Sequence, residues 1–186
     1  MQNKYNWYIL YTKTNAENRA MNGIIEAFRK RRLAYHFEPF CPETEYYYRS
    51  KQTQPDGTNY RMRLLFPNYI FVETDMPEVE FIKSFQRFIF DSSDIIRLLK
   101  YSETHIALDP NEKARLEYLF DDGRSVRHSV GKILYGDIIV EHGPLKGKEA
   151  LITHVNRHNR AATVNLDLFG APITTHLALE ITEKIA

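Results

Sequence analysis

The strongest constraint on the fold of this 186-residue chain is a change in its hydrophobic pattern near residue 120. Before that point, apolar runs typical of strands lie beside segments whose apolar residues recur at three- and four-residue intervals, as in helices. After it, short β-branched runs are separated by glycines, which predicts strands alone. The pattern therefore predicts a mixed α+β domain followed by a small all-β domain.

The first 120 residues predict the order strand, helix, strand, strand, helix, strand. Thr14 and Glu17 have capping-box spacing before the first helix, and Pro77 opens the second. The strands are expected at residues 7–11, 33–40, 69–72 and 95–98, with residue 89 also in strand. Residues 46–49 and 60–63 flank a turn-rich segment, 54–58, and predict a hairpin with a mobile tip. The order is that of a ferredoxin-like fold, in which an antiparallel sheet carries both helices on one face.

A third helix is expected to begin at Asp109 and Pro110, with Leu116, Leu119 and Phe120 on its apolar side. Residues 121–131 are polar and lack either period, which is typical of an exposed linker. About five short strands then fit into residues 132–186 and predict a small closed barrel. We therefore expect domains at residues 1–120 and 132–186, joined by the linker 121–131.

The composition excludes several classes of protein. With 43% hydrophobic residues, the chain can bury a core, and its single cysteine, Cys41, excludes an internal disulfide or a four-cysteine zinc site. No apolar run approaches the roughly 20 residues of a membrane span, and no signal peptide is evident. We expect a cytoplasmic protein that does not bind membranes, and we expect a monomer.

The net charge of +1 conceals a segregation of charges along the chain. Residues 1–63 carry 11 basic and 6 acidic side chains, whereas residues 64–124 carry 7 and 12. Such asymmetry suits one face to a polyanion and another to a basic or apolar protein, although ordinary solvated faces also produce it.

Motifs in both domains give the chain a resemblance to a known family. Trp7 and Tyr8 open the first strand, and residues 65–73 read Leu-Phe-Pro-Asn-Tyr-Ile-Phe-Val-Glu. Gly136-Asp137, residues 143–147 and residues 168–170 follow in the order of a KOW motif. The chain resembles the NusG transcription elongation factors, and Asn68 and Phe71 are more similar to the specialised RfaH branch. The resemblance implies an N-terminal NGN domain of ferredoxin-like fold and an SH3-like KOW barrel.

The resemblance also implies a function without catalysis or cofactors. The N-terminal sheet would offer an apolar pocket to the clamp helices of RNA polymerase, through aromatic anchors of the kind that dominate small interfaces. The implied polymerase-binding residues are Leu65, Phe66, Tyr69, Phe71, Ile95 and Ile96. Without the motif, the two-residue spacing of Tyr69 and Phe71, which puts them on one face of a strand, favours residues of a packed core.

Nucleic-acid contacts are implied for both domains. Lys13, Arg19 and Arg87 are placed to bind non-template DNA, while Gly23 and Glu26 depart from the basic pattern of the RfaH branch. In the barrel, two loops are expected to form one cationic patch for an RNA hairpin or a ribosomal protein. This patch comprises Lys146, Lys148, Arg157, His158 and Arg160, with Phe169 in the loop that housekeeping NusG uses for its partners. The alternative interpretation is that these charged residues lie in a solvated hairpin turn and bind no partner.

Other functions fit the sequence less well. The seven histidines are scattered, only His154 and His158 have i, i+4 spacing, and no phosphate-binding glycine loop is present, so we expect neither an enzyme nor a metal site. A ribosome-associated KOW protein would need a more basic chain. Val155, Thr163 and Ile173 favour strand, so we expect the barrel not to refold into a helical mask. The sequence favours a specialised antiterminator over a general elongation factor.

Overall fold

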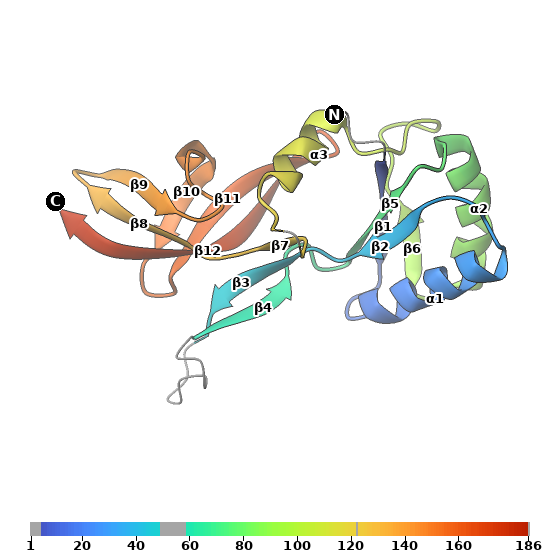
Figure 1. The fold of residues 1–186 in the computed structure, drawn as a ribbon, viewed down its shortest axis with the longest axis horizontal. Helices are drawn as coiled ribbons and strands as arrows, with labels where there is room; N and C mark the ends of the chain where they lie inside the picture. The colour runs from blue at the N-terminus through green and yellow to red at the C-terminus, as the bar shows by residue number, and fades with distance from the viewer. Residues whose placement is uncertain (1–4, 49–58, 122, 186) are drawn as a thin grey trace. The chain divides into compact units, whose positions relative to one another are not determined.

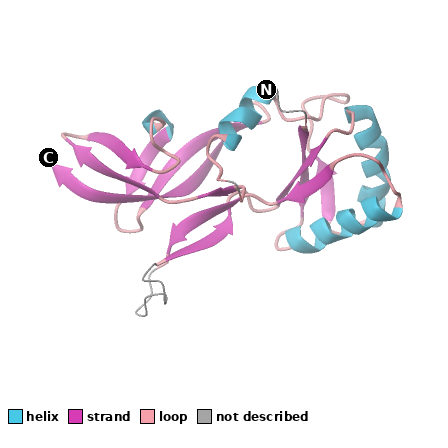
Figure 2. Cartoon of the chain, in the orientation of Figure 1, coloured by secondary structure: helices cyan, strands magenta, loops and turns pink. Residues whose placement is uncertain are grey.

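A computed structural model describes residues 5–48, 59–121 and 123–185, in two compact units. Unit 1 comprises residues 1–41 and 66–113, and unit 2 comprises residues 42–65 and 114–186. Figure 1 traces the chain through its elements, and Figure 2 shows that helices are concentrated in unit 1 and strands in unit 2. The expected hairpin tip at 54–58 lies outside the described residues.

Unit 1 has the predicted ferredoxin-like arrangement. Its elements are β1 (Asn6–Thr12), α1 (Glu17–Lys30), β2 (Phe37–Phe40), β5 (Tyr69–Thr74), α2 (Glu78–Asp91) and β6 (Ile95–Leu98). The strands form one sheet in the order β2-β5-β1-β6, and every neighbouring pair is antiparallel. Both helices lie on the same side of this sheet (Figure 1).

The core of unit 1 lies between the sheet and the two helices. Tyr8 and Leu10 of β1 point to this side, and Ile24 of α1 and Phe81 of α2 pack against them. All four side chains are at most 1% exposed. The Tyr8 ring lies 4.0 Å from that of Phe81, and its hydroxyl donates to the carbonyl oxygen of Met76 at 2.7 Å. The buried hydroxyl of Tyr8 therefore has a hydrogen-bond partner inside this core.

Three local expectations for unit 1 differ from the structure. Residue 89 lies in α2 instead of a strand, because the helix continues to Asp91. The second strand begins at Phe37 instead of Leu33, where pairing with β5 begins. Thr14 and Glu17 form no capping box: the N-cap of α1 is Ala16, without a side-chain cap. Both side chains hydrogen-bond to Asn68 instead.

The third helix, α3 (Pro110–Glu117), begins where the sequence predicts. Asp109 Oδ1 accepts hydrogen bonds from the backbone N–H of Asn111 at 2.8 Å and Glu112 at 3.4 Å, which is the geometry of an N-cap. Leu116 is buried, as its apolar pattern predicts, but the helix ends at Glu117, so the buried Leu119 and the half-buried Phe120 lie beyond it instead of on its apolar side.

Unit 2 consists mainly of strands. Its elements are β3 (Glu43–Tyr47), β4 (Tyr60–Leu64), β7 (Ser125–Val126), β8 (Ser129–Leu134), β9 (Asp137–His142), the 3₁₀ turn η1 (Glu149–Leu151), β10 (Ile152–Asn156), β11 (Ala161–Leu168) and β12 (Ala171–Ile185). The predicted hairpin, β3 with β4, is confirmed, and β7 extends it to a three-stranded sheet. The predicted five C-terminal strands pair in the order β10-β11-β12-β8-β9.

Two tight turns fix the register of the C-terminal sheet. Tyr135 and Gly136 join β8 to β9, and Phe169 and Gly170 join β11 to β12. All four have positive φ, between 51° and 94°. Positive φ at both central residues is typical of a type I′ turn, whose twist matches that of the paired strands.

The expected linker at 121–131 contains paired strand. β7 pairs in parallel with β3 over residues 43–44, and β8 begins at Ser129. Ser125, Val126 and Ser129 are buried. The compact units therefore divide the chain at other positions than the expected domains, whose boundaries stay a prediction.

Candidate functional site

An aromatic face covers the side of the unit 1 sheet that points away from α1 and α2. The register pairs Ile9 with Phe71 and Tyr11 with Tyr69, whereas the alternate pairs point into the helix-side core. Rings from several segments meet here. Phe71 lies 5.9 Å from Trp7, 5.5 Å from Phe40 and 5.7 Å from Phe66, measured between ring centroids. The aromatic face is defined here as Trp7, Tyr11, Phe40, Phe66, Tyr69 and Phe71.

The implied polymerase-binding residues differ in their exposure. Phe71 is 0% exposed, and Leu65, Phe66 and Ile95 are at most 5% exposed. Tyr69 is half-buried with its ring 5.3 Å from that of Tyr11, and Ile96 is 49% exposed. In this conformation the buried rings support the surface, while Tyr69 and Ile96 are the two that a partner can reach. The assignment of polymerase binding to these six residues stays a prediction.

Asn68 anchors the loop that leads into β5. Its φ of 74° is in the left-handed region, where asparagine is tolerated better than most residues. Its backbone N–H donates to Glu17 Oε1 at 2.7 Å and its amide Nδ2 donates to Thr14 Oγ1 at 3.1 Å. Its carbonyl accepts from the backbone N–H of Thr12 at 2.8 Å. Asn68 thus connects the start of β5 to the corner between β1 and α1.

The three residues implied in DNA binding do not form a free cationic cluster in the described part of the chain. The guanidinium of Arg19 binds Asp94 through two hydrogen bonds of 2.5 and 2.6 Å. These bonds, with the nearby charge of Lys13, lower the pKa of the Asp94 carboxyl. Lys13 is exposed, and its backbone N–H donates to Asp94 O at 2.9 Å. Arg87 lies in α2, and its side chain is outside the described residues.

A further polar group, which the sequence did not suggest, lies at the edge of unit 1. His36 Nε2 is 3.7 Å from Glu38 Oε2 and 3.5 Å from Glu73 Oε1. Among the described residues, these three bring potential metal-ligand atoms within 4.8 Å of one another. Other contacts hold the same residues, since Trp7 Nε1 donates to Glu73 Oε2 at 2.8 Å and the His36 ring stacks on Tyr5. The pairing of β2 with β5 brings Glu38 beside Glu73, which sequence spacing cannot indicate.

The implied partner-binding residues of unit 2 lie in three turns or loops of the C-terminal strands. Strand β10 pairs with β11. Asn156 lies opposite Ala161 next to the turn that joins the two strands, and Ile152 lies opposite Val164. Arg157, His158 and Arg160 therefore lie at the start of β11, whereas Phe169 follows its end. Lys148 precedes η1 and β10, whose first residue, Ile152, pairs with Val164 in the middle of β11. The assignment of these residues to one cationic patch stays a prediction.

Lys148 is engaged with its own unit. Its Nζ lies 3.5 Å from the centroid of the Tyr118 ring and donates to Pro144 O at 2.7 Å. Burial lowers the pKa of its ammonium group. Lys146 is exposed, and Phe169 is half-buried in its turn. Of the two lysines, Lys146 is the one whose side chain is open to solvent.

Arg160 faces the hairpin of β3 and β4. Its guanidinium lies 4.3 Å from the centroid of the Tyr47 ring and 3.0 Å from Glu180 Oε1. Burial opposes its charge, but the Tyr60 hydroxyl and Glu180 outweigh this effect and raise the pKa of the guanidinium. Burial is also the main cause that raises the pKa of Tyr60 to about 12. The hairpin thus contributes side chains to a site that the sequence assigned to loops of the barrel alone.

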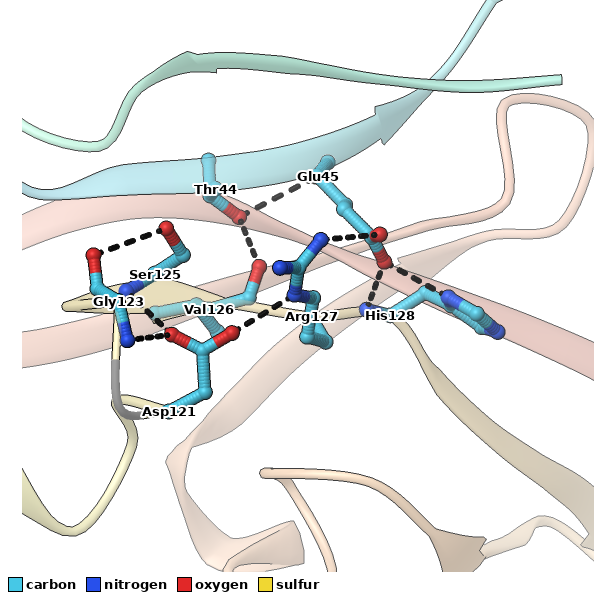
Figure 3. Close-up of polar contacts among 8 residues, drawn as sticks. All are labelled: Thr44, Glu45, Asp121, Gly123, Ser125, Val126, Arg127 and His128. Atoms are coloured by element: carbon cyan, nitrogen blue, oxygen red, sulfur yellow. Dashed lines mark hydrogen bonds and ion pairs between the residues drawn. The ribbon is translucent and has the colours of Figure 1, made fainter. Parts of the chain in front are cut away.

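A polar cluster joins the hairpin to the residues that precede β8 (Figure 3). Glu45 accepts from the backbone N–H of His128 at 2.6 Å and contacts Arg127 Nη1 at 3.3 Å. Burial opposes ionisation of Glu45, but the hydrogen bonds from His128 and Arg127 lower the pKa of its carboxyl. Asp121 accepts from the backbone N–H of Ser125 at 2.9 Å and pairs with Arg127 Nε at 2.7 Å. The polar residues expected to form a tether therefore bind one another.

Comparison with known proteins identifies the class of molecule. One unit has the ferredoxin-like fold, and the other is β-rich. The family described as "Transcription termination factor nusG" matches residues 5–117. The chain therefore belongs to the NusG family, whose members are transcription factors and not enzymes, and which interact with RNA polymerase.

The solved structures support the same fold. A structure described as "Domain interaction in Thermotoga maritima NusG" is similar to this chain with a TM-score of 0.56 and 15% sequence identity. The similarity covers 95% of this chain and 94% of that one. Comparison with curated proteins gave no match. Within the described residues, no helix combines the length and apolar character required to cross a membrane.

Proposed function

We propose that this chain is a specialised antiterminator that acts in the cytoplasm on transcribing RNA polymerase. Unit 1 binds the clamp helices of the polymerase through the aromatic face, and unit 2 recruits RNA. The observation that carries this proposal is the family match over residues 5–117, which includes the entire β2-β5-β1-β6 sheet. The half-buried Tyr69 gives a partner an apolar contact on the aromatic face, and the exposed Ile96 gives a second contact on β6, outside that face.

The specialised role is favoured by Asn68 and by the loss of arginine after the Phe169-Gly170 turn, where this chain has Ala171. A general elongation factor is the second candidate, since the Phe-Gly turn itself is kept and suits a ribosomal protein. Contact with non-template DNA would use the exposed Lys13, because Arg19 is neutralised by Asp94. A role in translation alone is disfavoured by the net charge of +1.

Transcription in vitro across an intrinsic terminator tests the proposal. Templates carry either the leader of the operon that encodes this protein or an unrelated leader. Read-through on the first template only is the expected result. Equal read-through on both would assign a general role, and no effect on either would contradict both roles.

Variants locate the polymerase contact in the same assay. Tyr69→Ala and Ile96→Glu should each weaken binding to the isolated clamp helices at least about fivefold, as loss of an interface anchor does. Tyr135→Ala is the matched control, because Tyr135 is 80% exposed in unit 2. Unchanged binding by Tyr69→Ala would remove the aromatic face from the proposal, and unchanged binding by Ile96→Glu would remove β6.

A further inference from the structure

A basic hollow lies within unit 2, between the hairpin and the C-terminal sheet. It has a volume of about 440 Å³. Its lining includes Tyr46 and Tyr47 of β3, Arg63 of β4, His154 of β10, Arg160 of the β10–β11 turn, and His176 of β12. Such a volume is typical of a site for one small ligand or one unit of a polymer.

The charges around the basic hollow suit an anion. Its lining residues include two arginines and two histidines, and none of those described is acidic. Glu180 outside the lining offsets part of the charge of Arg160. Arg63 is exposed and donates to the carbonyl oxygen of His176 at 3.3 Å, and among the described residues it forms no ion pair with a carboxylate. The hollow therefore keeps a positive potential in a chain whose net charge is +1.

Flat π-systems line the same hollow. The guanidinium of Arg63 lies 5.3 Å from the centroid of the Tyr46 ring, and that of Arg160 lies 4.3 Å from the centroid of Tyr47. Tyrosine rings and guanidinium planes are the groups on which unpaired bases stack, whatever the base. Tyr46 and Tyr47 follow one another in β3, so their side chains lie on opposite faces of the strand, and each carries a guanidinium, from Arg63 of β4 and from Arg160 of the β10–β11 turn. Each pair provides a stacking surface next to positive charge.

Neutral polar groups complete the lining. The amides of Asn156 and Asn159, the imidazole of exposed His154 and the hydroxyl of Thr163 supply both donors and acceptors. Thr163 Oγ1 lies 3.2 Å from His176 Nδ1, which fixes the orientation of that ring. Such groups can bond to base edges or sugar hydroxyls, which an acidic peptide does not offer.

From this combination we infer that the basic hollow binds single-stranded nucleic acid, with a phosphate at Arg63 and Arg160 and a base on the tyrosines. This inference rests on the proposed recruitment of RNA by unit 2 and places the site at the hairpin instead of at the loop with Lys146. It gives the hairpin, which lies outside the strands of the C-terminal sheet, a direct part in binding.

Fluorescence anisotropy with the full chain tests the inference. The labelled probes are a uridine and a thymidine oligonucleotide, each of about ten nucleotides, and an oligoglutamate peptide. The wild-type chain should bind an oligonucleotide more tightly than the peptide, with affinity that falls as salt rises. A preference for uridine or thymidine shows whether RNA or DNA is the natural strand. Stronger binding of the peptide would overturn the inference.

Charge-reversal variants locate the site. Arg63→Glu and His154→Glu should each weaken oligonucleotide binding about tenfold or more, and Arg63→Glu should also reduce the salt slope by about 0.7. Lys184→Glu is the matched control, because Lys184 is exposed on β12 outside the lining, and it should change the affinity less than about twofold. Lys146→Glu tests the alternative site in the loop. Circular dichroism and melting of each variant show that it is folded.

The outcomes separate this inference from the proposed function. If only Lys146→Glu weakens binding, the hollow is excluded while recruitment of RNA by unit 2 stands. If the wild-type chain binds neither oligonucleotide, both fail. Binding of the clamp helices by unit 1 is measured separately and is expected to be the same in every variant of the hollow.

Discussion

At the scale of single residues, Asn68 shows how one side chain can combine a conformational and a bonding role. The loop before β5 requires a left-handed residue, and the same residue must bond to the start of α1. Glycine satisfies the first requirement and most polar residues satisfy only the second. Asparagine meets both, because its short amide bonds locally and its αL cost is low.

Two substitutions at this position separate these roles. Asn68→Ala should lower the free energy of unfolding by about 1–3 kcal/mol, since it loses the Thr14 bond and incurs αL strain. Asn68→Gly should lose less, because only the bond to Thr14 is removed while the backbone bond to Glu17 is kept. Urea unfolding followed by tryptophan fluorescence gives both values. If glycine proved as harmful as alanine, strain would not be part of the explanation.

At the scale of elements, close backbone approach determines where glycine is required. A Cβ at Gly131 in β8 would lie 2.4 Å from the carbonyl oxygen of Ile139 in β9, whereas a Cβ at Gly23 in α1 would have no heavy atom within 4 Å. Both positions lie inside regular elements, so propensity alone would treat them alike. The neighbouring strand makes the difference.

Matched glycine substitutions test this argument. Gly131→Ala should lower the Tm, because either the β8–β9 pair or the chain beyond it must move to relieve the contact. Gly23→Ala should raise stability by about 0.5–1 kcal/mol, the usual gain from alanine inside a helix. Thermal unfolding by circular dichroism measures both. Equal effects of the two substitutions would contradict the packing argument.

The junction between the hairpin and β7 should respond to acid. The pKa of Glu45 is below its ordinary value of 4.5, so its ionised form stabilises the fold above that pH. This stabilisation is lost as the pH falls below about 4.5 and through the folded-state pKa. Glu45→Gln should lower the Tm at neutral pH and reduce the further loss of Tm between about pH 6 and pH 3.

Melting curves across this range check the prediction, with Glu43→Gln on the same strand as the matched control. The wild-type chain also carries Asp94 and Asp121, whose pKa values are lowered, so its Tm should fall in acid for several reasons. The informative quantity is the difference between wild type and Glu45→Gln. If that difference does not shrink as the pH falls, the Glu45 carboxylate is not the group responsible.

At the scale of the whole molecule, the compact units cut across the expected domains. Unit 2 takes in the hairpin at 42–65 and the segment from residue 114, in addition to the C-terminal strands. Ser129 alone holds two connections, since it pairs with Leu179 and its Oγ accepts from the backbone N–H of Leu145 at 3.1 Å. Residues before 132 therefore contribute to the stability of the sheet.

Two fragments test where the C-terminal domain begins. A fragment of residues 125–186 should be strand-rich by circular dichroism and should melt at a higher temperature than a fragment of residues 132–186, which lacks Ser129 and Gly131. A helix-dominated spectrum of the longer fragment would contradict the expectation that this domain does not refold. Equal melting temperatures would support the boundary at 132.

The sequence by itself determined the secondary structure order, the α+β class and the family, because these depend on local periodicity and on short motifs. Asp109 as the cap of α3 and the five C-terminal strands were predicted in this way. Local spacing could not show that Thr14 and Glu17 bind Asn68 instead of capping α1.

Only the tertiary structure decided this point, and it alone placed the hairpin tyrosines beside Arg160 and buried Phe71 among other rings. The physical reason is that hydrogen bonds, ion pairs and ring contacts act between atoms that are close in space, and the pairing of distant strands determines which atoms those are. Residues 47 and 160 are far apart in the chain, and no local pattern marks them as neighbours.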